Sequence, residues 1–338
     1  MSAHNVAPAP AAAPLATVAL GRCPGCRRSE GFGADALAGY RPLPFAYHFA
    51  GAVLPGGVCP QCGLRGLTVQ PAPHEFGRLY AREYFASGDV RCGHVGDYFA
   101  ERTALLSDAM ALLADAIEPA TARATGGRPG RLLELGCATG VLLEAAQRRG
   151  WTVQGVEYSA DAAAEAARHG VPVFVGALED ARLPDDGFDV AFLGDVLEHV
   201  PDPATVLRDV ARLLAPGGAL VLRGPMATHS LARRLAIGAS MVFRRTWRLD
   251  EPPYHLWEFT PGPLRALVAG AGLSIESFVQ SKTPPSLTRR RGPLLGPLLG
   301  ALDAFNVAWT GATNALGDRC MLVARRPGGA TRAAGAPR

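Results

Sequence analysis

The chain has 338 residues, 48% of them hydrophobic, which is enough for a packed core domain and a smaller accessory module. Its formal net charge of +4 is too small for the clustered basic footprint of a nucleic-acid-binding protein. No stretch reaches the roughly 18 uninterrupted apolar residues of a membrane-spanning helix, and residues 1–20 lack the early positive cluster of a secretory signal. We therefore expect a cytoplasmic protein with a disordered leader.

Two Cys-x-x-Cys pairs mark the N-terminal part of the chain: Cys23 with Cys26, and Cys59 with Cys62. Each such turn places two thiolates on one side, so two turns together complete a tetrahedral zinc site with four cysteine ligands. The 32 residues between the pairs form a longer loop than is usual, and redox or iron–sulfur chemistry is the alternative to structural zinc. The remaining cysteines are expected to be core or loop residues: Cys92, Cys137 and Cys320.

The next elements lead from a helix to a glycine-rich turn. Apolar residues at helical spacing predict a helix from Asp97 to about Ala120, and a linker rich in Gly and Pro follows over 125–131. Residues 132–140 then read Leu-Leu-Glu-Leu-Gly-Cys-Ala-Thr-Gly and precede a helical pattern over 141–149. This order predicts a strand, a tight turn with glycines at 136 and 140, and a helix, which together open a nucleotide-binding βαβ unit.

The spacing of these glycines indicates which nucleotide is bound. The dinucleotide fingerprint requires glycine at its first, third and sixth positions, and here those positions hold Gly136, Ala138 and Val141. A cofactor with an adenosine but no pyrophosphate fits better. Glu157 follows a second strand over 151–156, and a carboxylate at that strand end accepts hydrogen bonds from both hydroxyls of a ribose.

Helices and strands alternate beyond Glu157. A helix over 160–169, a strand over 171–175, a helix that begins at Asp202 and a fifth strand over 219–223 predict a parallel sheet covered on both faces. A long insertion over 224–258 follows, and connections of this length are usually lids or binding loops. Its apolar stretch from Leu235 to Phe243 lies between two arginine pairs. The stretch is either a helix packed on the core or an interfacial surface for a hydrophobic or lipid-linked acceptor.

Taken together, these motifs resemble those of class I S-adenosylmethionine-dependent methyltransferases over residues 130–280. The resemblance rests on the 134–140 loop and on three further segments in order, 187–190, 195–200 and 214–218. It implies a Rossmann-like α/β fold with a mostly parallel sheet, to which 273–280 and 319–324 add an antiparallel pair. It also implies S-adenosylmethionine as cofactor and a set of cofactor-binding residues: Glu134, Gly136, Cys137, Gly140, Glu157, Leu178, Glu179 and Asp195.

Within that set, the resemblance places Glu134 and the two glycines under the methionine part of the cofactor and Glu157 on its ribose. The family often has Gly-Asp after the third strand, where the Asp binds the adenine amino group. This chain has Gly176-Ala177 there, so the Leu178 amide and Glu179 are expected to replace it.

The N-terminal module resembles the zinc-ribbon head of bacterial methyltransferases that tailor sugars, polysaccharides and secondary metabolites. The resemblance rests on 59–64, 70–73 and 79–85 and implies that the head lies over the substrate side. Tyr80, Tyr84 and Phe85 are expected to pack at the domain junction rather than to touch substrate. The chain is thus predicted to divide as follows: disordered leader 1–20, zinc-ribbon module 21–75, helical connector 76–125, methyltransferase domain 126–285, C-terminal helix and last strand 286–328, and disordered tail 329–338.

Two histidines are predicted to remove a proton from the acceptor, which as general base catalysis adds about 10²–10⁴-fold to a rate. His199 follows the fourth strand, at the sheet edge where ligands bind, although His199 and Glu198 could instead only fix the loop before the next helix. His255 matches a family position that faces the acceptor, with Asp195 as its orienting partner. His229 is a third, weaker candidate.

We therefore expect methyl transfer to a hydroxyl of a sugar, glycan or natural product, with a small-molecule or glycan acceptor as the partner. Residues 194–197 lack the Pro-Pro-aromatic loop of enzymes that methylate base amino groups, so nucleic acid is not expected. One alternative is an RNA base methyltransferase that grips RNA through ribbon arginines: Arg22, Arg27, Arg28 and Arg65. Another is a catalytically silent scaffold, against which the retained cofactor residues argue. Peripheral membrane contact is an open but less favoured expectation.

Overall fold

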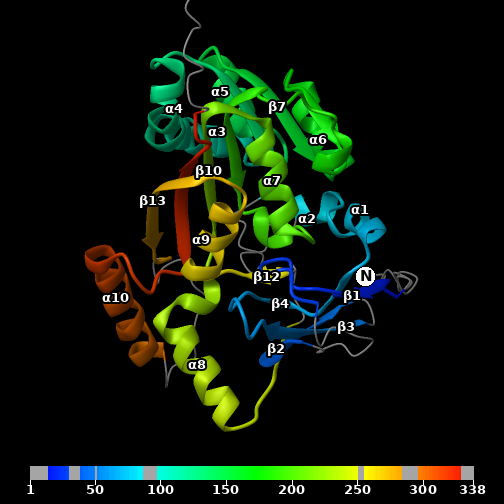
Figure 1. Ribbon diagram of the computed structural model, residues 1–338, viewed down its shortest axis with the longest axis vertical. Coiled ribbons are helices and arrows are strands. Elements are labelled where there is room, and N and C mark those ends of the chain that lie inside the picture. The colour runs from blue at the N-terminus through cyan, green and yellow to red at the C-terminus, as the bar shows by residue number, and fades with distance from the viewer. Residues whose placement is uncertain are drawn as a thin grey trace, which may run out of the picture.

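The computed structural model describes residues 14–29, 39–49, 52–86, 97–249, 255–283 and 296–328. Figure 1 shows a large sheet covered by helices and, below it, a smaller sheet formed mainly by N-terminal residues. Two helices, α8 (Leu231–Val242) and α10 (Gly296–Thr313), lie at the lower end of the molecule (Figure 1). The prediction of a Rossmann-like methyltransferase sheet with an additional N-terminal module is confirmed.

The large sheet has seven strands in the order β13-β14-β10-β9-β6-β7-β8. The pairings from β8 through β10 are parallel, whereas β14 pairs antiparallel with both β10 and β13. The predicted antiparallel pair at the end of the sheet is therefore confirmed. The strands are β6 (Arg131–Leu135), β7 (Thr152–Glu157), β8 (Val173–Val175), β9 (Phe188–Gly194), β10 (Leu214–Pro225), β13 (Ser274–Ser281) and β14 (Arg319–Arg325).

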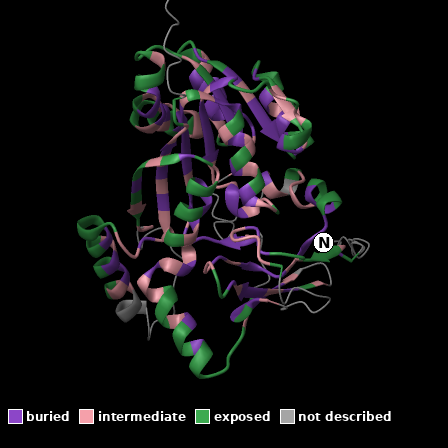
Figure 2. Ribbon diagram, viewed as in Figure 1, coloured by how far each residue is buried: buried purple, intermediate pink, exposed green. Residues whose placement is uncertain are grey.

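Alternate side chains of the central strands enter two separate cores, because successive residues of a strand point to opposite faces. Leu132 packs in a cluster with helical residues such as Leu113 and Leu143, while its neighbour Leu133 packs in another with Leu207. Figure 2 shows these strands as a buried centre between exposed helix surfaces. Both faces of the sheet are thus covered, which explains the continuous apolar runs in the sequence.

The helices that cover the sheet begin close to the predicted positions. Asp202 caps its helix by accepting from the Thr205 amide at 3.0 Å. The helix predicted from Asp97 begins later, at Arg102, because the Asp97 carboxylate binds the amides of residues 99 and 100 and holds a turn there. These helices are α3 (Arg102–Leu112), a π-helical turn (Leu113–Ile117), α4 (Glu118–Thr125), α5 (Val141–Arg148), α6 (Ala160–Arg168), α7 (Pro203–Leu213) and α9 (Pro261–Gly270).

The smaller sheet corrects the predicted boundary of the ribbon module at residue 75. Its five strands have the order β11-β2-β3-β4-β12, and both edge strands come from the 224–258 insertion. The insertion is therefore a structural bridge that completes the N-terminal sheet, and the module is not contiguous in sequence. Its strands are β2 (Arg41–Phe49), β3 (Ala52–Val58), β4 (Arg65–Leu67), β11 (Trp247–Leu249) and β12 (Trp257–Glu258).

Part of the predicted leader is ordered, which corrects the boundary at residue 20. Strand β1 (Thr17–Ala19) pairs antiparallel with β5 (Val69–Pro71), and Leu15 is buried. This segment is therefore ordered, because it gains a pairing strand and an apolar anchor. Short helices follow β5: a 3-10 turn (Pro73–Glu75), α1 (Phe76–Leu79) and α2 (Arg82–Ala86). Residues 1–13, Cys92 and the predicted tail over 329–338 lie outside the described residues.

Candidate functional site

The loop between β6 and α5 turns at two glycines that cannot carry side chains. Gly136 has a φ of 67°, and a Cβ there would lie 2.4 Å from Cγ2 of Val196. Gly140 has a φ of 72°, and its Cβ would lie 2.7 Å from the Cβ of Ala166. Because an L side chain would be both strained and crowded at these positions, the loop leaves bare backbone at the carboxyl edge of the sheet. Ligands bind at this edge in open α/β folds.

Glu157, at the end of β7, lies directly beside this loop. Its Oε2 accepts from the Ala138 amide at 2.8 Å, and its Oε1 accepts from the Ser159 amide at 2.9 Å. Burial raises the pKa of the carboxyl, although these amides favour the charged form. Each carboxylate oxygen has two lone pairs, so Glu157 keeps acceptor capacity for the two hydroxyls of a ribose.

Glu134, at the end of β6, is a second buried carboxylate in the same place. Its Oε2 is buried and has no hydrogen-bond partner among the described residues. Burial, with the nearby charge of Glu157, raises its pKa well above the usual range. A buried carboxylate oxygen without a partner fits a ligand that brings a cation or a donor. The amino group of S-adenosylmethionine is such a donor, so these residues fit the predicted cofactor.

The other predicted cofactor residues surround this centre. Cys137 is buried, and its Sγ lies where a Cβ on Gly155 would meet it at 2.6 Å. Its thiol therefore lies toward β7, and it also donates to the Ala138 carbonyl of the loop at 3.9 Å. Leu178 and Glu179 lie in a 3-10 turn (Leu178–Asp180) after β8. The Gly176 amide, just before this turn, donates to the Glu157 carbonyl at 2.9 Å, so the turn begins beside the end of β7. Burial, with the carboxylate of Glu179 close by, raises the pKa of Tyr158 to about 12.

Two residues near the start of α3 complete the site and carry no sequence motif. Arg102 donates to the Thr139 carbonyl at 2.7 Å and pairs with Glu144, so it fastens the glycine loop to α3. Tyr98 is half-buried, and its pKa is raised to about 12 by burial and by carboxylates that include Asp195 and Glu134. No local pattern reveals these residues, because their position depends on the packing of α3 against α5.

Asp195 is held by arginines rather than by a histidine. It has a positive φ of 55°, and both of its carboxylate oxygens accept from Nη2 of Arg319, at 2.5 and 2.7 Å. Arg223 lies 3.5 Å from the same carboxylate. Arg319 begins an antiparallel strand, so it starts at the edge where the parallel strands end. The ion pair therefore fixes the loop after β9, and Asp195 does not contact His255 as an orienting partner.

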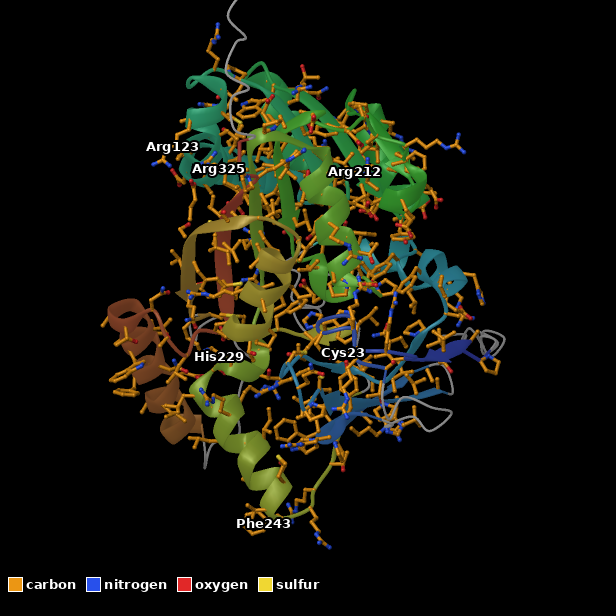
Figure 3. The ribbon with its side chains drawn as sticks, viewed as in Figure 1. Cys23, Arg123, Arg212, His229, Phe243 and Arg325 are labelled. Atoms are coloured by element: carbon orange, nitrogen blue, oxygen red, sulfur yellow. The ribbon has the colours of Figure 1, made fainter. Side chains whose placement is uncertain are left out.

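The two predicted histidines lie together at this edge. The rings of His199 and His255 have centroids 5.1 Å apart and meet edge to face. Nδ1 of His255 lies 3.4 Å from Glu258, so Glu258 is the carboxylate within ion-pair distance of this ring. Nδ1 of His199 lies 3.1 Å from the hydroxyl of Tyr80. His229 is not part of this cluster, because it lies at the entry to α8 (Figure 3).

The charges around these rings are strongly perturbed. Glu198 is buried, and burial raises its pKa to about 8. Burial alone would lower the pKa of His255, but the carboxylates of Glu258, Glu198 and Asp195 outweigh it and raise the pKa. Ligand atoms of Glu198, His199 and His255 lie within 4.8 Å of one another. Perturbed groups clustered in this way are typical of sites that move protons.

The N-terminal module covers this edge of the large sheet. Arg27 donates to the carboxylate of Asp202, the cap of α7, at 2.9 Å. The indole of Trp257, in the shared strand β12, donates to the Val200 carbonyl at 2.8 Å. Tyr80 packs edge to face on both Tyr84 and His199. The predicted junction packing of these aromatic residues is therefore present, and it also reaches one of the two histidines.

The four N-terminal cysteines converge on one point near the start of α7 (Figure 3 labels Cys23). The Sγ atoms of Cys23 and Cys62 lie 3.6 Å apart, and those of Cys26 and Cys59 lie 3.7 Å apart. Four sulfurs each about 2.3 Å from a tetrahedral zinc would lie about 3.8 Å from one another. The cluster therefore has the size of a zinc site with four cysteine ligands, and these cysteines form no disulfide.

Comparison with known proteins agrees with this geometry. Residues 101–277, more than half of the chain, match a family model described as a methyltransferase domain. The ubiquinone biosynthesis O-methyltransferase of a Caulobacter species is 36% identical over 154 residues, which cover 43% of this chain and 60% of that protein. The protein of the same name from Xanthomonas oryzae pv. oryzae is 32% identical over 169 residues, 48% of this chain and 70% of that protein. The chain thus matches only 60 to 70% of the length of these relatives.

Solved structures give a weaker likeness. An S-adenosylmethionine-dependent methyltransferase from Mesorhizobium loti matches with a TM-score of 0.42 and 20% identity, covering 63% of this chain and all of that one. The assignment rests instead on the family model, on the curated relatives and on the strand order. On that basis the chain belongs to the class I S-adenosylmethionine-dependent methyltransferases.

Proposed function

We propose that the protein transfers a methyl group to a hydroxyl of a small molecule. The observation that carries the proposal is the pair of histidines, 5.1 Å apart between ring centroids, at the sheet edge that also carries Glu134 and Glu157. The names of the relatives, O-methyltransferases of ubiquinone biosynthesis, favour oxygen as the methylated atom. Of the predicted acceptors, these names favour a natural product over a sugar or glycan.

On the cofactor side, the protein supplies two carboxylates and a bare loop. Bound S-adenosylmethionine supplies an electrophilic methyl group on a sulfonium. Glu157 would accept from its ribose hydroxyls, and Glu134 would face its amino group. Arg102 holds the loop by binding the Thr139 carbonyl at 2.7 Å. A loop fixed in this way keeps the methyl group aligned, and alignment of two reactants is worth up to about 7–11 kcal/mol.

On the acceptor side, His255 is the better placed of the two candidate bases. Nδ1 of His255 lies 3.4 Å from Glu258. A proton shared there leaves the lone pair on Nε2, which is the tautomer a general base requires. His199 directs Nδ1 to the Tyr80 hydroxyl and would position the acceptor. The side chains of His255 and His199 are 18% and 12% exposed, respectively, so bulk water has little access to them.

We also propose that the four-cysteine cluster holds a structural zinc ion. The proposal is supported by the distances between Sγ atoms, 3.6 Å from Cys23 to Cys62 and 3.7 Å from Cys26 to Cys59. A metal held by two distant turns stabilises the fold that brings those turns together. Because this module supplies β4, the partner of β12, it also positions Glu258 beside His255. Zinc therefore supports the acceptor side indirectly.

The alternative of an RNA methyltransferase loses support from the arginines of the ribbon. Arg27 is paired with Asp202 at 2.9 Å. Arg65 is half-buried and donates to the Thr228 carbonyl at 3.4 Å. Arginines that bind a carboxylate or a carbonyl within the protein do not present their charge to RNA phosphates. A small-molecule acceptor therefore stands as the proposal.

The test is release of adenosylhomocysteine by the full-length protein with a panel of acceptors: phenols and catechols, sugar nucleotides, and short RNA. Product mass spectrometry with fragmentation identifies the methylated atom. We expect methyl ethers with phenolic or alcoholic small molecules and a loss of about 10²–10⁴-fold in turnover for His255→Gln. His74→Gln, at a histidine whose side chain is 73% exposed, is the matched control. Methylation of RNA, or at carbon or nitrogen only, would overturn the proposal.

A further inference from the structure

Between positions 301 and 312, helix α10 buries its polar side chains and exposes only apolar ones. Asp303, Asn306 and Thr310 are buried: Asn306 accepts from the Leu231 amide at 3.0 Å, and Asp303 lies 3.8 Å from the only lysine, Lys282. Between positions 301 and 312 the exposed side chains are all apolar, with four alanines and two aromatic residues: Ala301, Ala304, Phe305, Ala308, Trp309 and Ala312. A surface helix in water has the reverse arrangement.

Helix α8, which contacts α10, carries further exposed apolar side chains. Leu235 and Val242 are 58% and 77% exposed, and they lie seven residues apart, on the same side of the helix. Phe243, at the tip of the helix, is 72% exposed and points away from the molecule (Figure 3). We call these three residues, together with Phe305 and Trp309, the apolar face. Monomeric proteins in water rarely gather side chains of this size without a binding role.

The charges around the apolar face distinguish between possible occupants. Residues 231–249 contain five arginines and no acidic residue: Arg233, Arg234, Arg244, Arg245 and Arg248. All five are exposed. In a symmetric dimer each copy presents the same surface to the other, so these arginines would meet arginines. An anionic lipid surface instead attracts each arginine near it and accepts apolar side chains between its headgroups.

We propose that α8 and α10 seat the protein on an anionic membrane surface, with the apolar face at the boundary between headgroups and acyl chains. The contact is interfacial, since no described helix has both the length and the apolar composition needed to cross a bilayer. Arginine pairs on each side of the apolar stretch of α8 bind the headgroups, and the aromatic side chains of α10 enter between them. Trp is well suited to this depth, because its ring is apolar and its N–H is polar.

The same geometry connects the membrane to the candidate active site. Helix α8 follows β10, which ends at Pro225, and α10 precedes β14, which begins at Arg319. Both links start from the sheet edge that carries Asp195 and the histidine pair. An apolar acceptor dissolved in the bilayer would therefore reach the active site from the membrane-facing end of the molecule. This second step rests on the proposed function, whereas membrane binding itself does not.

Sedimentation of the full-length protein with vesicles tests the membrane contact. We expect binding to phosphatidylcholine vesicles that contain phosphatidylglycerol, weaker binding to phosphatidylcholine alone, and loss of binding at high salt. Phe305→Ser/Trp309→Ser should bind at least about tenfold more weakly, as should Arg244→Gln/Arg245→Gln. The matched controls are Val175→Ser and Arg168→Gln, which change exposed residues elsewhere on the molecule and should bind as the wild type does.

Tryptophan quenching by brominated lipid reports the depth of insertion. Trp151 and Trp257 are buried, whereas Trp247 is only partly buried and lies close in sequence to Arg244 and Arg245. Quenching should therefore come from Trp309 and Trp247: it should fall in Trp309→Phe, and what remains should disappear in Trp247→Phe/Trp309→Phe. Unchanged vesicle binding by the Phe305→Ser/Trp309→Ser variant would overturn the proposal. So would conversion of a wild-type dimer into monomers by that variant without any vesicle binding, because the apolar face would then join two copies.

Turnover separates this inference from the proposed function. With a water-dispersed acceptor and no vesicles, the surface variants should turn over at the wild-type rate, since none of the changed residues lies in the cofactor loop or the histidine cluster. A wild-type protein that binds vesicles but methylates no small-molecule hydroxyl would remove the proposed function and leave the membrane contact in place. A protein that methylates small molecules but does not bind anionic vesicles would remove the membrane contact and leave the proposed function in place.

Discussion

Replacing Glu157 by alanine tests the cofactor site most directly. In the structure its two oxygens accept from the amides of Ala138 and Ser159 at 2.8 and 2.9 Å, and its side chain is buried. The variant removes the acceptor predicted for both ribose hydroxyls. It also releases two backbone amides, that of Ala138 in the glycine loop and that of Ser159 at the start of α6.

The size of the effect follows from those contacts. A hydrogen bond to a charged group contributes about 1.5–3 kcal/mol, so two ribose bonds at the lower bound contribute about 3 kcal/mol, which corresponds to roughly 150-fold in Kd. The effect on folding should be smaller. Alanine loses two backbone contacts, but it also removes a buried carboxylate whose pKa is raised by burial, so we expect a decrease of at most about 2 kcal/mol in the free energy of unfolding.

Isothermal titration calorimetry with adenosylhomocysteine measures the affinity, and urea unfolding measures the stability. Asp161→Ala, an exposed acidic residue in the first turn of α6, is the matched control and should bind as the wild type does. Glu157→Gln keeps the shape of the side chain but points an amide N–H at a backbone N–H, so it should bind almost as weakly as Glu157→Ala. Cofactor affinity within threefold of wild type in a folded Glu157→Ala protein would refute the assignment.

Three further outcomes can be measured on the same protein. Metal analysis should find one zinc per chain, lost in Cys26→Ser, and iron–sulfur absorbance or metal-free folded protein would contradict this. His255→Gln should lower turnover by about 10²–10⁴-fold. Because carboxylates raise the pKa of His255, its neutral form appears only at higher pH. The ascending limb of the wild-type pH–rate profile should therefore lie above the ordinary histidine value of about 6.5. Full turnover in this variant would move the role to His199. Gly136→Ala, whose Cβ would lie 2.4 Å from a neighbouring methyl group, should lose about 1–3 kcal/mol in urea unfolding, while Gly77→Ala, with nothing within 4 Å, should not.

The sequence by itself determined the large sheet and the cofactor loop. The β6–α5 turn is coded locally, because Gly136 and Gly140 stand where only glycine tolerates a positive φ of 67° and 72°. Strand order follows from alternating elements joined by short connections, which leave few possible topologies. The cysteine cluster was also predictable, since each Cys-x-x-Cys turn brings two sulfurs together by local geometry alone.

Only the tertiary structure decided which residues meet across the site. His255 faces Glu258 instead of Asp195, because β12 joins the N-terminal sheet, while Arg319 reaches Asp195 from the last strand. These pairings depend on strand partners distant in sequence, and no local pattern encodes such a choice.

The N-terminal boundary and helix α10 depend on the same kind of contact. The insertion was predicted as a lid or a binding loop, yet it supplies both edge strands of the smaller sheet. The pattern of α10 does not tell which side is buried, since apolar residues normally face the core. Here Asn306 and Asp303 bind Leu231 and Lys282 inside the protein. Burial of hydrogen-bonded polar groups turns the apolar side outward, and only the position of those distant partners decides it.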